Sequence, residues 1–147
     1  MKQRFTLVPA VYIVFRDGDK VLLLRRANTG YHDGEYSLPA GHVDGGEPAV
    51  MAAVREAKEE VGVDVDPADL HLVHTMHRLS KEPELHERID LYFEIKDWKG
   101  TAHNAEPHKC DELRWVKSDE LPANTILEVV QALNKIVANE PYSDFNF

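Results

Sequence analysis

The fold of this chain is decided by one stretch, Gly41-His-Val-Asp-Gly-Gly-Glu47-Pro-Ala-Val-Met-Ala-Ala-Val-Arg55-Glu56-Ala-Lys-Glu59-Glu60-Val-Gly62. Its first six residues hold three glycines and an aspartate, which predict a tight loop with unusual backbone angles. Pro48 suits the first turn of a helix, and Gly62 suits the position just past its end. The stretch therefore predicts a loop over residues 41–46 and a helix from about Pro48 to Val61.

This helix has two distinct faces when its residues are placed at 3.6 per turn. One face is an apolar stripe, expected to pack on the core, formed by Val50, Val54, Ala57 and Val61. Glu56, Glu59 and Glu60 are related by steps of three and four, so they fall together on a neighbouring sector. The helix is thus expected to be anchored by its apolar stripe and to project three carboxylates beside it.

A solvated acidic surface is the alternative explanation for these carboxylates. Like charges at i,i+4 cost a few tenths of a kcal/mol, and acidic residues in a last turn oppose the helix dipole by about 0.3–1 kcal/mol each. A surface helix has no need of Glu59 and Glu60 there. Mg²⁺ or Mn²⁺ would offset the repulsion, because hard cations prefer clustered carboxylate oxygens. Spacing alone leaves the two explanations equally open.

A wider pattern favours the metal. Seven residues follow the spacing G-x5-E-x7-R-E-x-x-E-E-x-G, namely Gly41, Glu47, Arg55, Glu56, Glu59, Glu60 and Gly62. At residue frequencies of about 7%, a chance match in such a chain is on the order of 10⁻⁶. The pattern resembles a complete Nudix box. Ala57 departs from it mildly, because larger aliphatic residues are usual there, and this affects packing only.

The resemblance implies a metal site and a metal-assisted displacement at phosphorus. Its ligands would be Glu56, Glu59 and Glu60, helped by a backbone carbonyl of Ala40 or Gly41, and its ion would be Mg²⁺ or Mn²⁺. The ion would neutralise charge on a diphosphate and lower the pKa of a bound water, whose proton a carboxylate accepts.

Further roles follow from the same resemblance. Glu47 and Arg55 resemble the pair that ties the loop to the helix, although about 12 Å of helical rise separates them. Glu59 is the first candidate for the general base. Some relatives use a glutamate from a distant loop, so the alternatives are Glu106, Asp111 and Glu112, each of which is as well explained as an ordinary loop carboxylate.

The remaining elements predict an α+β fold, resembling the Nudix α/β/α sandwich with a mixed sheet and two main helices. Strands are expected over residues 7–15, 21–24, 36–38, 70–78, 89–95 and 113–117, with a turn at 17–19 and loops at 27–34, 79–87 and 99–109. Thr125 and Glu128 predict a capping box that opens the second helix. We expect one domain over residues 1–147, with residues 139–147 as a loose tail.

Composition limits the partners. The 147 residues are 43% hydrophobic and 29% charged, with a net charge of −9 and a pI near 5.3. This balance is typical of a globular protein and argues against binding to a long nucleic acid, which needs Lys and Arg to neutralise phosphate. No apolar run approaches the roughly 20 residues of a membrane span. An acidic protein can still bind a small phosphate compound if a divalent cation lies between the two anions.

The compartment is expected to be the cytoplasm. Cys110 is the only cysteine, so no internal disulfide can form. The residues that follow Met1 lack the apolar segment of a signal peptide. Cys110 itself is expected to be a plain, partly buried residue.

The substrate is expected to be a small nucleotide-like diphosphate, and first a nucleoside triphosphate or a modified relative cut to the monophosphate and pyrophosphate. Segments 104–110, 113–116 and 119–122 resemble the short MutT-like members, which act on nucleoside triphosphates. Candidate substrate contacts are Arg25, Arg26, Tyr31, His32, Glu106 and Asp111. An arginine at a strand end suits phosphate and an aromatic ring suits a stacked base, although a pair of surface charges or a core ring would explain them too.

Other classes stay open. An ADP-ribose, ADP-sugar or other dinucleotide pyrophosphatase would share the box, and so would a non-catalytic nucleotide-binding module, which would not need every box carboxylate. An isopentenyl diphosphate isomerase-like enzyme would want a catalytic cysteine, and Cys110 lies far downstream of the box. Zinc is not expected, because His71 and His77 share one strand face and His74 takes the other. The oligomeric state stays open, with a homodimer among the options.

Overall fold

The computed structural model describes residues 2–80 and 86–147. Its strands are β1 (Val8–Asp17), β2 (Lys20–Arg26), β3 (Tyr36–Ser37), β4 (Ala40–His42), β5 (His71–Leu79), β6 (Glu87–Ile95), β7 (Cys110–Lys117) and β8 (Tyr142–Phe145). Its helical segments are α1 (Ala49–Glu56), the π-helical η1 (Ala57–Val61), the 3₁₀ turn η2 (Pro67–Asp69) and α2 (Leu127–Val137). None of the described helices is both long and apolar enough to cross a lipid bilayer.

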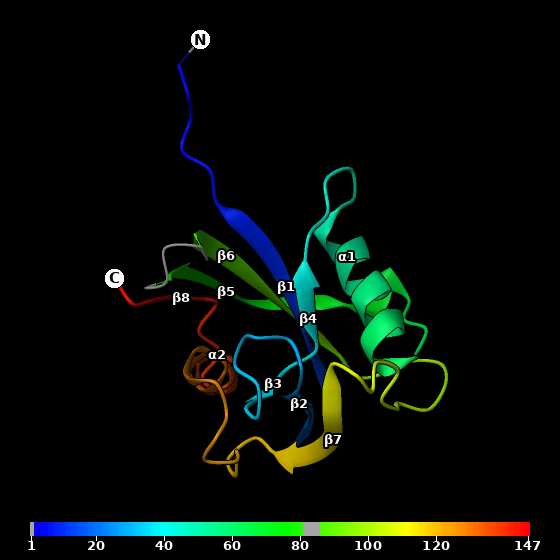
Figure 1. Ribbon diagram of the computed structural model, residues 1–147. Coiled ribbons are helices and arrows are strands. Elements are labelled where there is room, and N and C mark those ends of the chain that lie inside the picture. Colours follow the sequence, from blue (N-terminus) through cyan, green and yellow to red (C-terminus); the bar gives the residue numbers. More distant parts are fainter. Residues whose placement is uncertain (1, 81–85) are drawn as a thin grey trace.

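The strands form one mixed sheet whose central strand is β1 (Figure 1). The main path runs β3-β2-β1-β6-β5-β8, while β4 pairs with β1 and β7 pairs with β2. β1 is parallel to β6 but antiparallel to β2 and β4. The turn between β1 and β2 lies at Gly18 and Asp19, as the sequence predicts.

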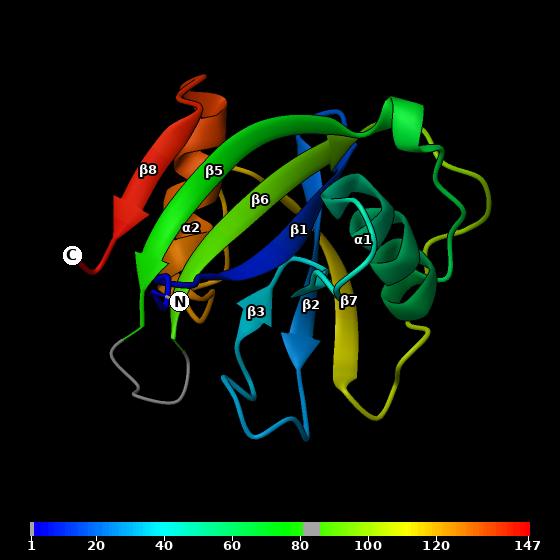
Figure 2. The same cartoon turned by 90° about the horizontal axis from the view of Figure 1, so that it is seen from above.

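Two cores lie on opposite faces of this sheet, because successive strand residues point to opposite sides. Tyr12 and Val14 of β1 pack in the core that includes the buried side of α2. Ile13 and Phe15 pack in the core that includes α1 and η1. Figures 1 and 2 show α1 and α2 covering different faces of the sheet. The predicted α/β/α sandwich is therefore confirmed.

The predicted helix is confirmed over its length, but its buried face is shifted from the predicted stripe. The residues of this helix that are completely buried are Ala52, Ala53, Ala57 and Val61. Val50 and Val54 are only partly buried at the edge of the same core. Small alanine side chains let the helix approach the sheet closely, so the tightest contact forms along them rather than along the valines.

Two predicted loops and the predicted tail contain strand residues. Gly41 and His42 belong to β4, where Gly41 pairs with Val11 of β1. The predicted loop 79–87 starts and ends inside strands, since Leu79 closes β5 and Glu87 opens β6, and residues 81–85 lie outside the described part. The expected loose tail was wrong for residues 142–145, which form β8 parallel to β5.

The cause of this last error is a buried histidine of β5. The two ring nitrogens of His74 contact the carbonyl oxygen of Glu140 and the hydroxyl of Ser143, both at 2.8 Å. If the C-terminal segment moved away from this buried ring, both ring nitrogens of His74 would lose their hydrogen-bond partners. The contacts therefore fix the C-terminal segment beside β5.

The predicted capping box at α2 was also wrong. The hydroxyl of Thr125 donates to the carbonyl of Pro122 at 2.7 Å, and Ile126 occupies the N-cap position without a side-chain cap. Glu128 accepts a hydrogen bond from Arg78 on β5 instead. A buried arginine needs its counter-charge more than a helix start needs a cap, so the ion pair takes the carboxylate.

Candidate active site

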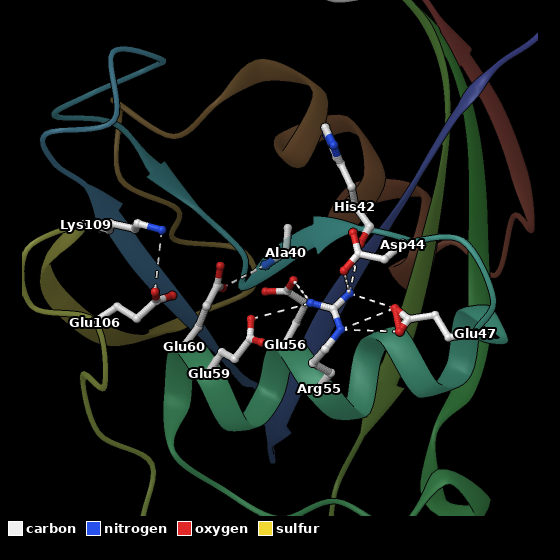
Figure 3. Close-up of polar contacts among 10 residues, drawn as sticks. All are labelled: Ala40, His42, Asp44, Glu47, Arg55, Glu56, Glu59, Glu60, Glu106 and Lys109. Atoms are coloured by element: carbon white, nitrogen blue, oxygen red, sulfur yellow. Dashed lines mark hydrogen bonds and ion pairs between the residues drawn. The ribbon is translucent and has the colours of Figure 1, made fainter.

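A cavity of about 640 Å³ lies where α1, η1, β4 and the loop before β7 meet. Glu56, Glu59 and Glu60 line one of its walls. Figure 3 shows the three carboxylates on the same side of the helix, directed toward the strand that carries Ala40. The three box glutamates are thus brought to one place, as the wheel predicts.

Glu60 and Glu56 both lie close to the backbone of β4. The backbone N–H of Ala40 donates to Oε2 of Glu60 at 3.0 Å. A Cβ atom on Gly41 would lie 2.1 Å from Oε1 of Glu56, far inside contact distance. The first box position therefore needs glycine because the Glu56 carboxylate occupies the space of a side chain.

The end of the helix is unusual in two ways. Residues 57–61 form a π-helical turn, which holds more residues per turn than the α-helix and is often found at functional sites. Gly62 then adopts φ of +72°, and a Cβ there would lie 2.2 Å from Cε1 of His103. Glycine is required twice over at this position, and the wide turn sets the directions of Glu59 and Glu60.

Arg55 makes polar contacts with several of the residues around the glutamates (Figure 3). Its Nη2 donates to Oε1 of Glu47 at 2.7 Å and to the carbonyl of His42 at 3.1 Å. Its Nη1 donates to Oε1 of Glu56 at 2.8 Å and lies 3.5 Å from Oε2 of Glu59. The expected contact between Glu47 and Arg55 thus closes, and the same guanidinium holds Glu56 in place.

Glu56 and Glu60 have strongly raised pKa values. Burial, followed by repulsion from Glu59, raises the pKa of Glu56 to about 7, although Arg55 opposes the shift. Burial, followed by repulsion from Glu56, raises the pKa of Glu60 to about 8, against the N–H donated by Ala40. One arginine therefore does not compensate the negative charge of this wall.

The donor set fits a hard divalent cation. Carboxylates crowded into a partly buried wall lose their repulsion when a cation lies among them. Within the described residues, no three His, Cys, Asp or Glu side chains are grouped tightly enough to hold an ion as they stand. Glu56, Glu59 and Glu60 would have to turn toward one another to share one.

Three of the expected substrate residues line the cavity: Arg26, Tyr31 and Glu106. The Arg26 guanidinium lies over the Tyr31 ring at 5.3 Å from its centre, and its Nε donates to the Tyr31 carbonyl at 2.7 Å. Glu106 lies 3.7 Å from the ammonium group of Lys109, which lines the same cavity. Positive groups thus face the glutamate wall.

Other expected residues are not among the described residues that line the cavity, and they pair elsewhere. Nε of Arg25 donates to Oδ1 of Asp111 at 2.6 Å on the neighbouring strand. His32 contacts the Glu35 carboxylate. The pairing of β2 with β7 shifts register between Arg25 and Arg26, and of these two residues Arg26 alone lines the cavity.

Glu112, the remaining alternative for the general base, lies with this second group. Its carboxylate accepts a hydrogen bond from the hydroxyl of Tyr36 at 2.9 Å, and Nη1 of Arg25 lies 3.3 Å away. The Tyr36 ring is buried. Of the three loop carboxylates considered as alternative bases, Glu106 alone lines the cavity.

Sequence reasoning missed several residues that line the cavity, namely Tyr12, His42, Arg88, Lys109 and Glu128. A usable signal existed in β6. Arg88 and Asp90 alternate with Ile89 and Leu91, so one face of an otherwise apolar strand is charged. A charged strand face that is buried has to meet partners or a cavity.

The chain is similar to several known proteins. Residues 6–138 match the family model described as NUDIX domain. Over 117 residues the chain is 30% identical to the NAD-capped RNA hydrolase NudC of Stutzerimonas stutzeri, covering 80% of this chain and 39% of that protein. It is 28% identical to the 8-oxo-dGTP diphosphatase of Escherichia coli, covering 77% of this chain and 85% of that one.

The chain spans only a fifth to two fifths of the length of the first curated relatives it matches. Among solved structures, the MutT NUDIX hydrolase of Burkholderia pseudomallei superposes with a TM-score of 0.78 at 22% identity. That match covers 88% of this chain and 98% of the other. At this identity the likeness concerns the fold.

Proposed function

The chain belongs to the Nudix family of hydrolases, and from that premise we propose that it cuts a nucleoside triphosphate, ordinary or modified, into the monophosphate and pyrophosphate. The observation that carries the proposal is the cavity itself, in which three box glutamates face Arg26 and Lys109. A polyphosphate needs both kinds of wall, one for a divalent cation and one for direct contact with phosphate oxygens.

The metal would be Mg²⁺ or Mn²⁺, held by Glu56, Glu59, Glu60 and a backbone carbonyl of Ala40 or Gly41. When bound, such an ion neutralises charge on the diphosphate and lowers the pKa of a water. The raised pKa values of Glu56 and Glu60 support this set, because burial and then repulsion from neighbouring carboxylates disfavour their charged forms, and a cation bound among them would relieve both effects.

Glu59 is the proposed general base. Half of its side chain is exposed, and it lines the cavity, so a water in the cavity can reach its carboxylate. Its contact with Arg55 is 3.5 Å, longer than the contacts that hold Glu47 and Glu56. Arg55 and Glu47 are positioning residues in this proposal, since they fix the loop and the Glu56 carboxylate rather than the water.

We assign Arg26 and Lys109 to contacts with the substrate's phosphate groups and Tyr31 to the rim of the site. A small, compact polyphosphate suits a cavity of about 640 Å³. An extended basic groove for RNA is not expected in a chain with a net charge of −9. We place the activity in the cytoplasm, where a lone cysteine stays reduced.

A dinucleotide or ADP-sugar pyrophosphatase is the second candidate. It is favoured by the similarity to a NAD-capped RNA hydrolase, because the NAD cap is a dinucleotide. The same glutamates would serve, because the cut bond is again a phosphoanhydride. The two candidates differ in what lies beyond the diphosphate.

A substrate panel separates them. kcat/KM is measured at fixed Mg²⁺ for nucleoside triphosphates, ADP-ribose, NAD and diadenosine polyphosphates, with an excess-EDTA arm. We expect a triphosphate to be best and all turnover to stop in EDTA. A tenfold advantage of ADP-ribose, about 1.4 kcal/mol of transition-state preference, would replace the first candidate with the second. Turnover undiminished by EDTA would remove the metal role, and no turnover at all would leave a binding module.

A further inference from the structure

The cavity has a second polar wall, built by β6 and α2 rather than by the glutamate helix. Arg88 of β6 and Glu128 of α2 line it, together with Tyr12 and Ile126. α2 covers the opposite face of the sheet from α1 (Figure 2). A substrate whose diphosphate lies at Glu56, Glu59 and Glu60 therefore has room to extend toward a different set of polar groups.

Arg88 is buried but incompletely bonded. Only 8% of the residue is exposed, and neither its Nε nor Oδ1 of Asp90 has a hydrogen-bond partner within residues 2–80 and 86–147. The only hydrogen bond that its guanidinium makes to the described residues runs from Nη2 to Nε2 of His42, at 3.1 Å. The nearest counter-charge, Oδ1 of Asp90, lies 3.8 Å from Nε. A guanidinium with five N–H groups is thus held at the cavity with donors to spare.

A purely structural role explains Arg78 but not Arg88. Arg78 donates to Oδ2 of Asp90 at 2.8 Å and to Oε1 of Glu128 at 3.1 Å, so it already bridges both acids. An arginine buried only to complete that network would close its gap to Asp90. Leaving a buried donor unpaired costs about 1–3 kcal/mol, which a ligand in the cavity would offset.

Resting on the nucleotide hydrolysis proposed above, we propose that Arg88 and Glu128 bind the hydrogen-bonding edge of the substrate's base and select a keto base of the guanine type over adenine. Arginine only donates hydrogen bonds, and a carboxylate only accepts them. Guanine offers its O6 carbonyl and N7 as acceptors, beside the N1–H and amino donors, and arginine is its commonest specific partner.

Adenine mismatches this pair. It has an amino group where guanine has the carbonyl, so N–H would face the donors of Arg88. It has an unprotonated N1 where guanine has N1–H, so a lone pair would face the carboxylate of Glu128. A site built around buried polar groups rejects the analogue that leaves them unpaired more strongly than an apolar pocket does. Arg88 and Glu128 thus determine specificity and take no part in the chemistry at phosphorus.

The test is the ratio of kcat/KM for GTP to that for ATP, with UTP and CTP alongside. The wild type is expected to favour GTP by about fivefold or more, the lower end of discrimination by an arginine–guanine contact. In Arg88→Lys, which keeps the charge but not the planar fork, and in Glu128→Gln, the ratio should fall toward one. Glu94→Gln is the matched control. Glu94 lies on β6, as Arg88 does, and the substitution removes its part-buried ion pair with Arg16. This variant should leave the ratio unchanged.

Each outcome decides something. A wild-type ratio of one or below overturns the inference even if both variants fail to fold, and so does an unchanged ratio in folded Arg88→Lys. If none of the four triphosphates is hydrolysed, the proposed function fails instead, and binding of GMP against AMP, followed by tryptophan fluorescence, then decides the inference alone. Preferred GMP binding that Arg88→Lys abolishes would sustain it, and equal binding of GMP and AMP would end it.

Discussion

Two buried carboxylates of this protein, Glu56 on the helix and Glu128 on α2, differ in their counter-charges. Both are 8% exposed. Glu128 lies 3.1 Å from Nη1 of Arg78, a guanidinium only 5% exposed. Glu56 shares Arg55 with Glu47 and lies among further carboxylates, and burial with the repulsion of Glu59 raises its pKa to about 7. Equal burial therefore accompanies two different electrostatic states.

The difference shows how charge is divided between structure and function. In the Arg78 network, buried charges of opposite sign meet at hydrogen-bonding distance, so Arg78 compensates the charges of Asp90 and Glu128 inside the fold. On the glutamate wall, negative charge exceeds positive charge, so the carboxylates repel one another. This repulsion does not stabilise the fold. An unbalanced cluster of this kind is stabilised by a ligand of opposite charge. The largest effects of substitution should therefore be on catalysis at the wall and on stability at the network.

The largest expected effect is the loss of turnover in Glu59→Gln and Glu60→Gln. Each keeps the side-chain size and removes a charge, so turnover should fall by at least about 10²-fold, the scale of losing a base or a key electrostatic group. Tm without divalent ions should not fall, because repulsion is relieved. Asp64→Asn is the control, since it removes an exposed carboxylate paired with Lys58 next to the same helix. Near-full turnover in either variant would show that its residue has been assigned wrongly.

At the network the expected effect is on stability. Arg78→Met removes the arginine that pairs Asp90 and Glu128, leaving a completely buried Asp90 without its main partner. Breaking a buried pair in this way costs about 3–5 kcal/mol. Urea denaturation should show this loss in the free energy of unfolding. A loss below about 1 kcal/mol would mean that the network does not hold the fold.

A third expected effect is a pH dependence of stability in the metal-free protein. The pKa of Glu56 is about 7 and that of Glu60 about 8 in the folded chain, against 4.5 as the ordinary value. The folded state therefore binds more protons than the unfolded state between these limits. Its free energy of unfolding should fall as pH rises from about 4.5 to 8.

The matched comparison for this prediction is Glu60→Gln, which cannot titrate at that position. Its free energy of unfolding should fall less steeply over the same pH window. Denaturation curves taken in EDTA at several pH values measure both slopes. Identical slopes for the wild type and Glu60→Gln would contradict the raised pKa of Glu60.

Local pattern accounts for much of the helix and the box. The spacing of Glu56, Glu59 and Glu60 predicts their shared sector, and Gly62 predicts the helix end, because both depend on residues within a few positions. The π-helical turn over residues 57–61 does not follow from that spacing. Residues more than forty positions away bond to this turn, since the N–H groups of His103 and Ala105 donate to the carbonyls of Val61 and Glu60 at 3.0 and 3.2 Å.

Long-range pairing explains the other differences. Glu128 looked like a capping residue because its distance from Thr125 is the right one, yet its partner Arg78 is 50 residues away. The tail became a strand through His74, 69 residues before Ser143. The sequence does not distinguish Arg25 from Arg26 as strand-end residues, and they differ in the fold because Arg25 pairs with Asp111 while Arg26 lines the cavity. Each case needs a contact that the local sequence does not encode.

The central claim is that the glutamate wall carries uncompensated charge in order to hold a divalent cation. The most direct measurement is the anomalous scattering of crystals grown with Mn²⁺. We expect a Mn²⁺ peak bounded by the carboxylates of Glu56, Glu59 and Glu60, within about 2–2.5 Å of their oxygens. Carboxylates that stay apart at saturating Mn²⁺, with no peak among them, would contradict it.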